Sequence, residues 1–146
     1  MNCRIENKGE LRLFVHFKDF NEETRKEGIP ALWDAHYKKE IGEGVSCYVG
    51  ICSGNGKEVF QYGIGLYAED VDTVPEGFQE LCLPEHTWAV FQLEASTPIA
   101  IQDAWDCIER EFLSSIEEYE IAADYDIEYY LSEGSCEIWV PVKKKG

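Results

Sequence analysis

The chain contains the same series of predicted elements twice, and this repeat restricts its possible folds more than any other feature. In each copy an alternating apolar segment precedes a stretch whose apolar residues recur at helical spacing, and two further alternating segments follow. The two helical stretches carry a tryptophan at a similar place, Trp33 and Trp105, 72 residues apart. The sequence therefore predicts two strand–helix–strand–strand units.

The apolar pattern also gives the extent of each predicted element. The predicted helices are IPALWDAHYKKEI and TPIAIQDAWDCIEREFL. Each has a proline near its start, Pro30 or Pro98, which suits a first helical turn, and Thr97 fits an N-cap. The predicted strands are LRLFVHFKDF, VSCYVGICSG and KEVFQYGIGLYAED in the first unit, and HTWAVFQLEA, DYDIEYYL and CEIWVPVKK in the second. A short strand at 78–83 is expected between the units.

The connections between these elements predict one antiparallel domain. Short turns, SGNGK and SEGS, join the last two strands of each unit as hairpins. We therefore predict an α+β fold built from a duplicated strand–helix–strand–strand module, a curved antiparallel sheet with two main helices on one side. No long linker separates the two repeats, approximately residues 10–70 and 78–143, so residues 1–146 should form a single domain.

The charge of the chain argues against one large class of partners. The formal net charge is −16, and the stretch from Glu58 to Glu109 holds eleven acidic residues and no lysine or arginine. Such a surface repels phosphate backbones, so we expect no binding to nucleic acid. The same surface attracts cations, although solubility alone explains most of these acids.

Other motifs that carry chemistry are missing from the sequence. The six cysteines are scattered without a C-x-x-C pair, and the histidines show no metal-like spacing, so we expect free, mostly buried thiols, no metal and no cofactor. The GIG sequence at 63–65 lies inside a strand pattern, where glycine marks a bulge or a close backbone approach. No apolar run reaches the roughly 18 residues that a membrane span needs. The polar start MNCRIENKGE lacks a signal-peptide pattern, so we expect a cytoplasmic location.

One acidic residue stands among aromatic residues in the segment DYDIEYYLSEG. On a strand, Glu128 and Tyr130 share one face, while Tyr125, Ile127 and Tyr129 point to the other. Glu128 is either a solvated strand residue or a partner for a cation. A carboxylate surrounded by rings has a raised pKa unless a cation arrives, and aromatic faces themselves attract cations.

Six segments, in order, resemble one known family. They are IPALWDAHY, FQYGIGLYAED, PEGFQELCLPEHTWAVFQ, AIQDAWDCIEREFL, DYDIEYY and EIWVPVKK, and they resemble the gyrase-inhibitor-like domains. This domain also forms the effector-binding part of many AraC-type and multidrug-responsive transcription regulators. The resemblance implies a ligand cleft between the two repeats, lined by aromatic residues, with a buried glutamate that meets lipophilic, cationic compounds. That glutamate corresponds to Glu128. Where the family usually has tyrosine and tryptophan, this chain has Trp88 and Phe112.

The aromatic residues each have a packing role as the alternative to a ligand role. Trp139 lies on the strand face opposite Ile138 and Val140, where a cleft or partly exposed packing would explain it. Trp33 and Trp105 lie on apolar helix faces and are expected to pack in the core, with Trp105 closer to the cleft. The residues expected to bind the ligand are Glu128, Trp88, Tyr130, Tyr62, Trp105 and Trp139.

Relatives in this family imply three roles, and the sequence leaves all three open. Because no helix-turn-helix segment is recognisable, we expect a stand-alone binding domain for aromatic compounds that are lipophilic or cationic. The second role is hydrolysis of electrophilic, cyclopropane-containing natural products, with Glu128 orienting or deprotonating water and Tyr62 donating to the leaving oxygen. The third is interaction with a protein such as a regulator or DNA gyrase. A single acid among rings suffices for binding, so the first role is favoured.

Overall fold

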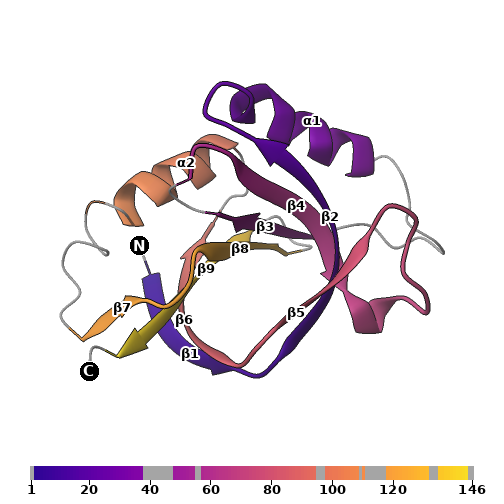
Figure 1. The fold of residues 1–146 in the computed structure, drawn as a ribbon. Helices are drawn as coiled ribbons and strands as arrows, with labels where there is room; N and C mark the ends of the chain where they lie inside the picture. The colour runs from indigo at the N-terminus through magenta and orange to yellow at the C-terminus, as the bar shows by residue number, and fades with distance from the viewer. Residues whose placement is uncertain are drawn as a thin grey trace.

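In the part of the chain that the structure describes, a curved, nine-stranded antiparallel sheet forms the body of the protein (Figure 1). The computed structural model describes residues 2–37, 48–54, 57–94, 98–108, 110, 118–131 and 135–144. Its strands are β1 (Asn2–Lys8), β2 (Leu11–Phe20), β3 (Val49–Ser53), β4 (Phe60–Tyr67), β5 (Gln79–Leu83), β6 (His86–Leu93), β7 (Tyr119–Ile121), β8 (Tyr125–Tyr130) and β9 (Cys136–Lys144). Its helices are α1 (Arg25–Tyr37), α2 (Pro98–Cys107) and the short 3-10 helix η1 (Ala68–Asp70).

The strands pair in the same way in both repeats. In the first, β4 lies between β2 and β3, and in the second β9 lies between β6 and β8. The two halves join where β3 pairs with β8 at the middle of the sheet. Both long helices lie on the same side of the sheet (Figure 1). The predicted α+β fold with a curved antiparallel sheet is confirmed.

Two strands, β1 and β7, were not predicted from the sequence, and β1 ties the repeats together. β1 precedes the first repeat but pairs along its whole length with β6 of the second. The short strand expected at 78–83 is present as β5, and it pairs with β2 of the first repeat. The described strand order therefore runs from β1 at one edge to β5 at the other, and β7 adds to β9. The exposed thiols of Cys3 and Cys82 lie on these two edge strands, so the expectation of mostly buried cysteines is wrong there.

Helix α1 starts earlier than its proline suggested. The side-chain oxygen of Asn21 accepts hydrogen bonds of 2.9 Å from the backbone N–H groups of Glu23 and Thr24, which sets up the first turn before Arg25. Pro30 consequently lies inside the helix and not in its first turn. Helix α2 does begin at Pro98, whereas the predicted cap Thr97 and the predicted end near Phe112 lie outside the described residues.

The two faces of the sheet are packed with different residues. On the helix side, Leu32 and Trp33 of α1 pack on β2 and β4, while Ala104 and Ile108 pack on β6 and β9. The opposite, concave side holds a second core that includes Ile127 of β8. Because side chains alternate along a strand, the residues of β8 contribute in turn to the two faces.

The GIG segment of β4 allows a close backbone approach, one of the two expected readings. A Cβ atom added at Gly65 would overlap the carbonyl oxygen of Phe14 on β2. Pairing between β2 and β4 continues without interruption through both glycines, so the segment contains no bulge.

Candidate functional site

Glu128 lies at the middle of the sheet, on the face covered by the helices. Its side chain is buried, with an exposed fraction of 8% for the residue. The hydroxyl of Tyr62 on β4 donates a 3.0 Å hydrogen bond to one carboxylate oxygen, and the hydroxyl of Tyr130 donates a 3.2 Å bond to the other. Within the described part of the chain, Glu128 forms no ion pair. The carboxylate is thus hydrogen-bonded but not neutralised by a bonded cation.

Trp33 of α1 completes this group. Its indole N–H donates a 2.8 Å hydrogen bond to the Tyr62 hydroxyl, and its ring meets the Tyr130 ring edge-on at 4.8 Å. Sequence reasoning assigned Trp33 to the core and did not connect it with Glu128. The available signal was its place in the repeat, which matches that of Trp105, a residue expected near the cleft. We refer to Trp33, Tyr62, Glu128 and Tyr130 as the Glu128 group.

A glycine makes the contact between Tyr62 and Glu128 possible. Gly50 on β3 lies directly opposite Glu128 in the β3–β8 ladder. A Cβ atom added at Gly50 would overlap the hydroxyl of Tyr62 and would lie 3.2 Å from Cζ2 of Trp33. The missing side chain therefore provides the space through which the Tyr62 hydroxyl reaches across β3.

Burial controls the protonation of the group. Desolvation raises the pKa of the Glu128 carboxyl, while the hydrogen bonds from Tyr62 and Tyr130 and the charge of Arg25 offset part of that rise. Desolvation and the nearby carboxylate raise the pKa of both tyrosines, so both hydroxyls keep their protons near neutral pH. Glu128 can therefore hold a proton or pair with a cation, and both would relieve the cost of a buried negative charge.

The structure does not bring Trp88 and Trp139 to Glu128. Both pack in the concave core with Ile127, on the other face of the sheet. The Trp139 ring stacks on Tyr129 at 5.4 Å, and the buried indole N–H of Trp88 has no hydrogen-bond partner among the described residues. The sequence showed which residues of one strand share a face, but it could not relate the faces of different strands, because that depends on their register.

The remaining predicted residue, Trp105, lies on the same side of the sheet as Glu128. It is half-buried on α2 and packs against the core cluster beneath that helix, to which Tyr130 also contributes. Tyr130 packs against the clusters beneath both helices, so it is the member of the Glu128 group that shares a cluster with Trp105.

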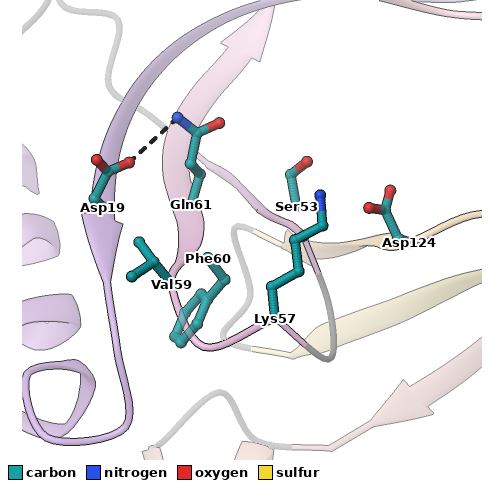
Figure 2. Close-up of a pocket in the computed structure, with 8 residues that line it drawn as sticks. Asp19, Ser53, Lys57, Val59, Phe60, Gln61 and Asp124 are labelled. Carbon is teal, nitrogen blue, oxygen red and sulfur yellow. Dashed lines mark hydrogen bonds between the residues drawn. The ribbon is translucent and has the colours of Figure 1, made fainter.

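A cavity of about 280 Å³ lies away from the Glu128 group, at one end of β3 and β4 (Figure 2). Its lining residues are Asp19, Ser53, Gly54, Lys57, Val59, Phe60, Gln61 and Asp124. Figure 2 shows Asp19 and Gln61 joined by a 3.2 Å hydrogen bond on one wall, with Lys57 and Asp124 further along. The cavity has a mixed polar and apolar lining with Phe60 as its one aromatic residue, and it does not include Glu128, so it is not the aromatic cleft expected from the sequence.

Two further searches bear on the kind of site. The described residues contain no group of three or more histidine, cysteine, aspartate or glutamate side chains placed to hold a metal ion. None of the helices in the described ranges is long and apolar enough to cross a membrane.

Comparison with known proteins identifies the family. Residues 13–142 match the sequence model of a family described as integron-associated effector-binding protein. The chain belongs to this family of effector-binding proteins, and the predicted relationship to gyrase-inhibitor-like domains is confirmed. No curated protein sequence matches.

Solved structures share the fold at low sequence identity. The protein SAV2435, solved bound to tetraphenylphosphonium, has a TM-score of 0.68 and 15% identity, with 98% of this chain and 94% of that chain covered. An integron cassette protein from Vibrio cholerae has a TM-score of 0.69 and 14% identity, with 97% and 95% covered. EcmrR, solved in complex with DNA, has a TM-score of 0.64 and 12% identity, and the match covers 99% of this chain but 58% of that one.

Proposed function

We propose that this effector-binding domain binds lipophilic aromatic cations, with Glu128 as the partner of the positive charge. The observation that carries the proposal is the buried carboxylate of Glu128, held by two tyrosine hydroxyls and without an ion pair among the described residues. Burial of such a charge costs free energy that a bound cation would offset. In the cell such a protein would sense or sequester drug-like compounds.

Three further observations support this proposal. Tyr62 and Tyr130 bond to the carboxylate and Trp33 contacts both tyrosines, and aromatic rings of this kind attract cations. A protein of the same fold has been solved with tetraphenylphosphonium, a lipophilic cation. The acidic charge of the whole chain would draw cations toward the protein before they bind.

Two ions of the same shape and opposite charge test the proposal. Tetraphenylphosphonium and tetraphenylborate both present four phenyl rings. A difference in their affinities therefore results from the sign of the charge and not from the shape of the ion. We expect Glu128→Gln to weaken tetraphenylphosphonium more than tenfold, about 1.4 kcal/mol, and not to weaken tetraphenylborate. Calorimetry or quenching of tryptophan fluorescence would measure both affinities.

Glu120→Gln provides the matched control. Glu120 lies on β7, where its carboxylate is 3.7 Å from Lys143 and exposed, so this variant removes one negative charge far from the buried group. Its affinities should equal those of the unmodified protein. If Glu128→Gln weakens both ions equally, Glu128 only shapes the site. If neither ion binds to the unmodified protein, the proposed ligand class is wrong.

Hydrolysis is a second candidate, favoured by the contact between Tyr62 and Glu128. An acid and a hydroxyl within 3.0 Å of each other are the two groups that a hydrolase of electrophilic compounds would need, one to orient water and one to donate a proton. The Tyr62 proton, however, already points to Glu128, which suits ligand binding equally well. Turnover of a cyclopropane-containing electrophile, lost in both Glu128→Gln and Tyr62→Phe, would favour hydrolysis over stoichiometric binding.

A further inference from the structure

We propose that two copies of this chain associate through their β1 strands, in antiparallel register with Ile5 opposite Ile5, to form one continuous sheet. β1 is an edge of the sheet: it pairs with β6 on one side, and no described strand pairs with its other side. An unpaired strand edge presents a row of backbone N–H and C=O groups that a second copy can satisfy.

The side chains of β1 are complementary to those of a second β1. Ile5 is the central residue of the seven, so a two-fold axis at this position pairs the whole of Asn2–Lys8 with its copy. Arg4 then lies opposite Glu6 of the second copy, and Glu6 lies opposite Arg4. A shift of two residues in either direction would place Arg4 opposite Arg4, or Glu6 opposite Glu6. The register centred on Ile5 is thus the one that both charge and overlap favour.

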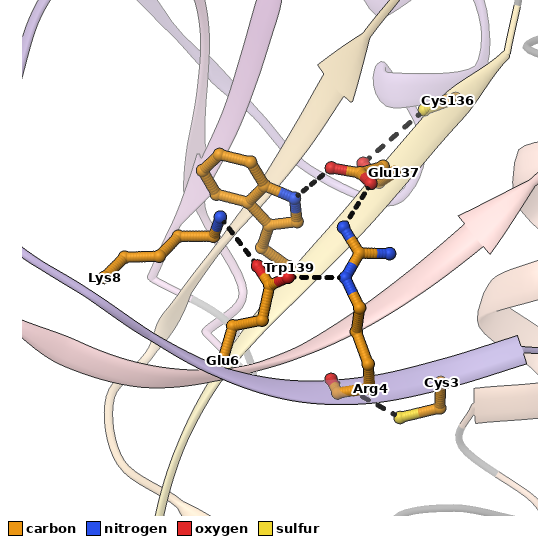
Figure 3. A network of polar contacts seen from close by, with 7 residues as sticks. All are labelled: Cys3, Arg4, Glu6, Lys8, Cys136, Glu137 and Trp139. Atoms are coloured by element: carbon orange, nitrogen blue, oxygen red, sulfur yellow. Dashed lines mark hydrogen bonds and ion pairs between the residues drawn. The ribbon is translucent and has the colours of Figure 1, made fainter.

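The charged side chains of β1 are already held in place for this contact. Figure 3 shows Arg4 bonded at 2.6 Å to both Glu6 and Glu137, and Lys8 bonded at 2.9 Å to Glu6. The Lys8 ammonium also lies 4.3 Å from the centroid of the Trp139 ring. Because these contacts order the three side chains within one copy, pairing with a second copy would cost less side-chain entropy.

The other face of β1 adds an apolar contact. Ile5 is 41% exposed, one of the few large apolar side chains that the described surface leaves uncovered. In the proposed register the two Ile5 side chains meet at the two-fold axis and cover each other.

Charge also favours β1 over other surfaces for self-association. Two copies that each carry a net charge of −16 repel each other wherever acidic surfaces meet. The segment 2–8 contains Arg4, Lys8 and one acid, Glu6, so its formal charge is +1. Since a two-fold axis at β1 is perpendicular to the sheet, both Glu128 groups would lie on the same side of the joined sheet.

Disulfide trapping tests the register directly. With Ile5 opposite Ile5, Cys3 lies opposite Asn7 of the second copy, at the Cα separation of about 4.5–5.5 Å that a disulfide accepts. Within one extended strand, residues 3 and 7 lie about 13 Å apart and cannot be bridged. We expect Asn7→Cys in a Cys82→Ser background to give a covalent dimer on mild oxidation, with a 3–7 linkage in peptide mapping. A linkage between residues 3 and 9 would instead report the register that places Glu6 opposite Glu6. We therefore expect Gly9→Cys in the same background to give no 3–9 linkage.

Sedimentation equilibrium tests association without oxidation. We expect a monomer–dimer equilibrium in the micromolar range and at least tenfold weaker association for Ile5→Lys. Ile121→Lys is the matched control, since Ile121 on β7 is similarly exposed, at 44%, and should leave the equilibrium unchanged. A monomer at 200 micromolar, a dimer that Ile5→Lys does not weaken, or oligomers that keep growing would each overturn the proposal. Growing oligomers would indicate pairing of β1 with β5 of the next copy.

Discussion

At the scale of single residues, Glu128 is a buried acid without an ion pair among the described residues. Asp126, two residues earlier on the same face of β8, is also buried, so two acids lie close together beneath the helices. Burial, and after it the charges of these two acids, raise the pKa of the Cys52 thiol to about 12, which keeps this cysteine protonated and unreactive near neutral pH. The negative charge in this region is therefore carried by carboxylates and not by a thiolate.

The raised pKa of Glu128 predicts a pH-dependent cost to stability. Because its pKa is higher in the folded than in the unfolded protein, the folded state binds the proton more tightly. The stabilisation from this proton is complete below the unfolded pKa of about 4.3 and is lost as the pH rises through the folded value. Each unit of rise corresponds to about 1.4 kcal/mol.

Glu128→Gln should remove this dependence. We expect the variant to have a free energy of unfolding close to that of the unmodified protein at pH 4 and higher by about 1 kcal/mol or more at pH 7. Urea denaturation of both proteins at the two pH values measures the difference between their free energies of unfolding. The titration of the other acids cancels in this difference because it is common to both proteins. The opposite result would be a variant whose stability, compared with that of the unmodified protein, falls between pH 4 and pH 7. That result would mean that a cation neutralises Glu128 in the folded state.

At the scale of elements, the Glu128 group depends on three adjacent strands and one helix. β4 supplies Tyr62, β8 supplies Glu128 and Tyr130, α1 supplies Trp33, and β3 between the two strands supplies only the space above Gly50. A residue that contributes no side chain is thus as necessary to the geometry as those that do.

Gly50→Ala should break the group while leaving the strand intact. The added methyl would displace the Tyr62 hydroxyl, which loses its bond to Glu128 and strains the contact with Trp33. Overpacking of this kind typically costs about 1–3 kcal/mol. Thermal and urea denaturation measure the loss. Gly9→Ala is the control, because no atom lies within 4 Å of the position where its Cβ would be. Equal stability of the two variants would contradict the assigned role of Gly50.

A strand could be predicted from the sequence when one of its faces is buried in a core, because burial gives it an apolar pattern. β2, β6 and β9 alternate clearly because one or both of their faces are in a core, and the structure places them where the pattern did. β1 carries the polar sequence NCRIENK and gains its structure by pairing with β6, a partner some 80 residues away, so no local pattern could show it. The separation of Trp88 and Trp139 from Glu128 has the same origin, since strand register is a long-range property.

At the scale of the whole molecule, the two repeats are alike in pairing but different in what they place around their shared centre. We expect the halves to superpose with Trp33 and Trp105 at corresponding places, yet Trp33 bonds to the Glu128 group while Trp105 packs over the core beneath α2. The duplicated fold therefore supports one acidic group near its centre, on the strand pair β3 and β8 where the halves meet.

The charge of the whole molecule leads to the last prediction, that this chain does not bind duplex DNA. Among the described residues, the bases of β1 pair with acids of β1 and β9, and Lys143 of β9 pairs with Glu120, so the basic surface is small and partly neutralised. The stretch 58–109 adds eleven acids and no lysine or arginine. EcmrR was solved with DNA, and the match to this chain covers 58% of it.

An electrophoretic mobility-shift assay with a 30-base-pair duplex would check this expectation. We expect no complex at about 150 mM salt with protein at 100 micromolar, and none at 50 mM salt, because protein–DNA contacts that release counterions tighten as salt falls and this surface has few to offer. A complex at micromolar concentration that strengthens at low salt would show that a local basic surface, such as that of β1 or the end of β9, outweighs the net charge of −16. Ile5→Lys, which adds a positive charge at the β1 edge, would then strengthen that complex. Ile121→Lys adds the same charge on β7, so a smaller effect of this variant would show that the local surface of β1 and not the net charge is responsible.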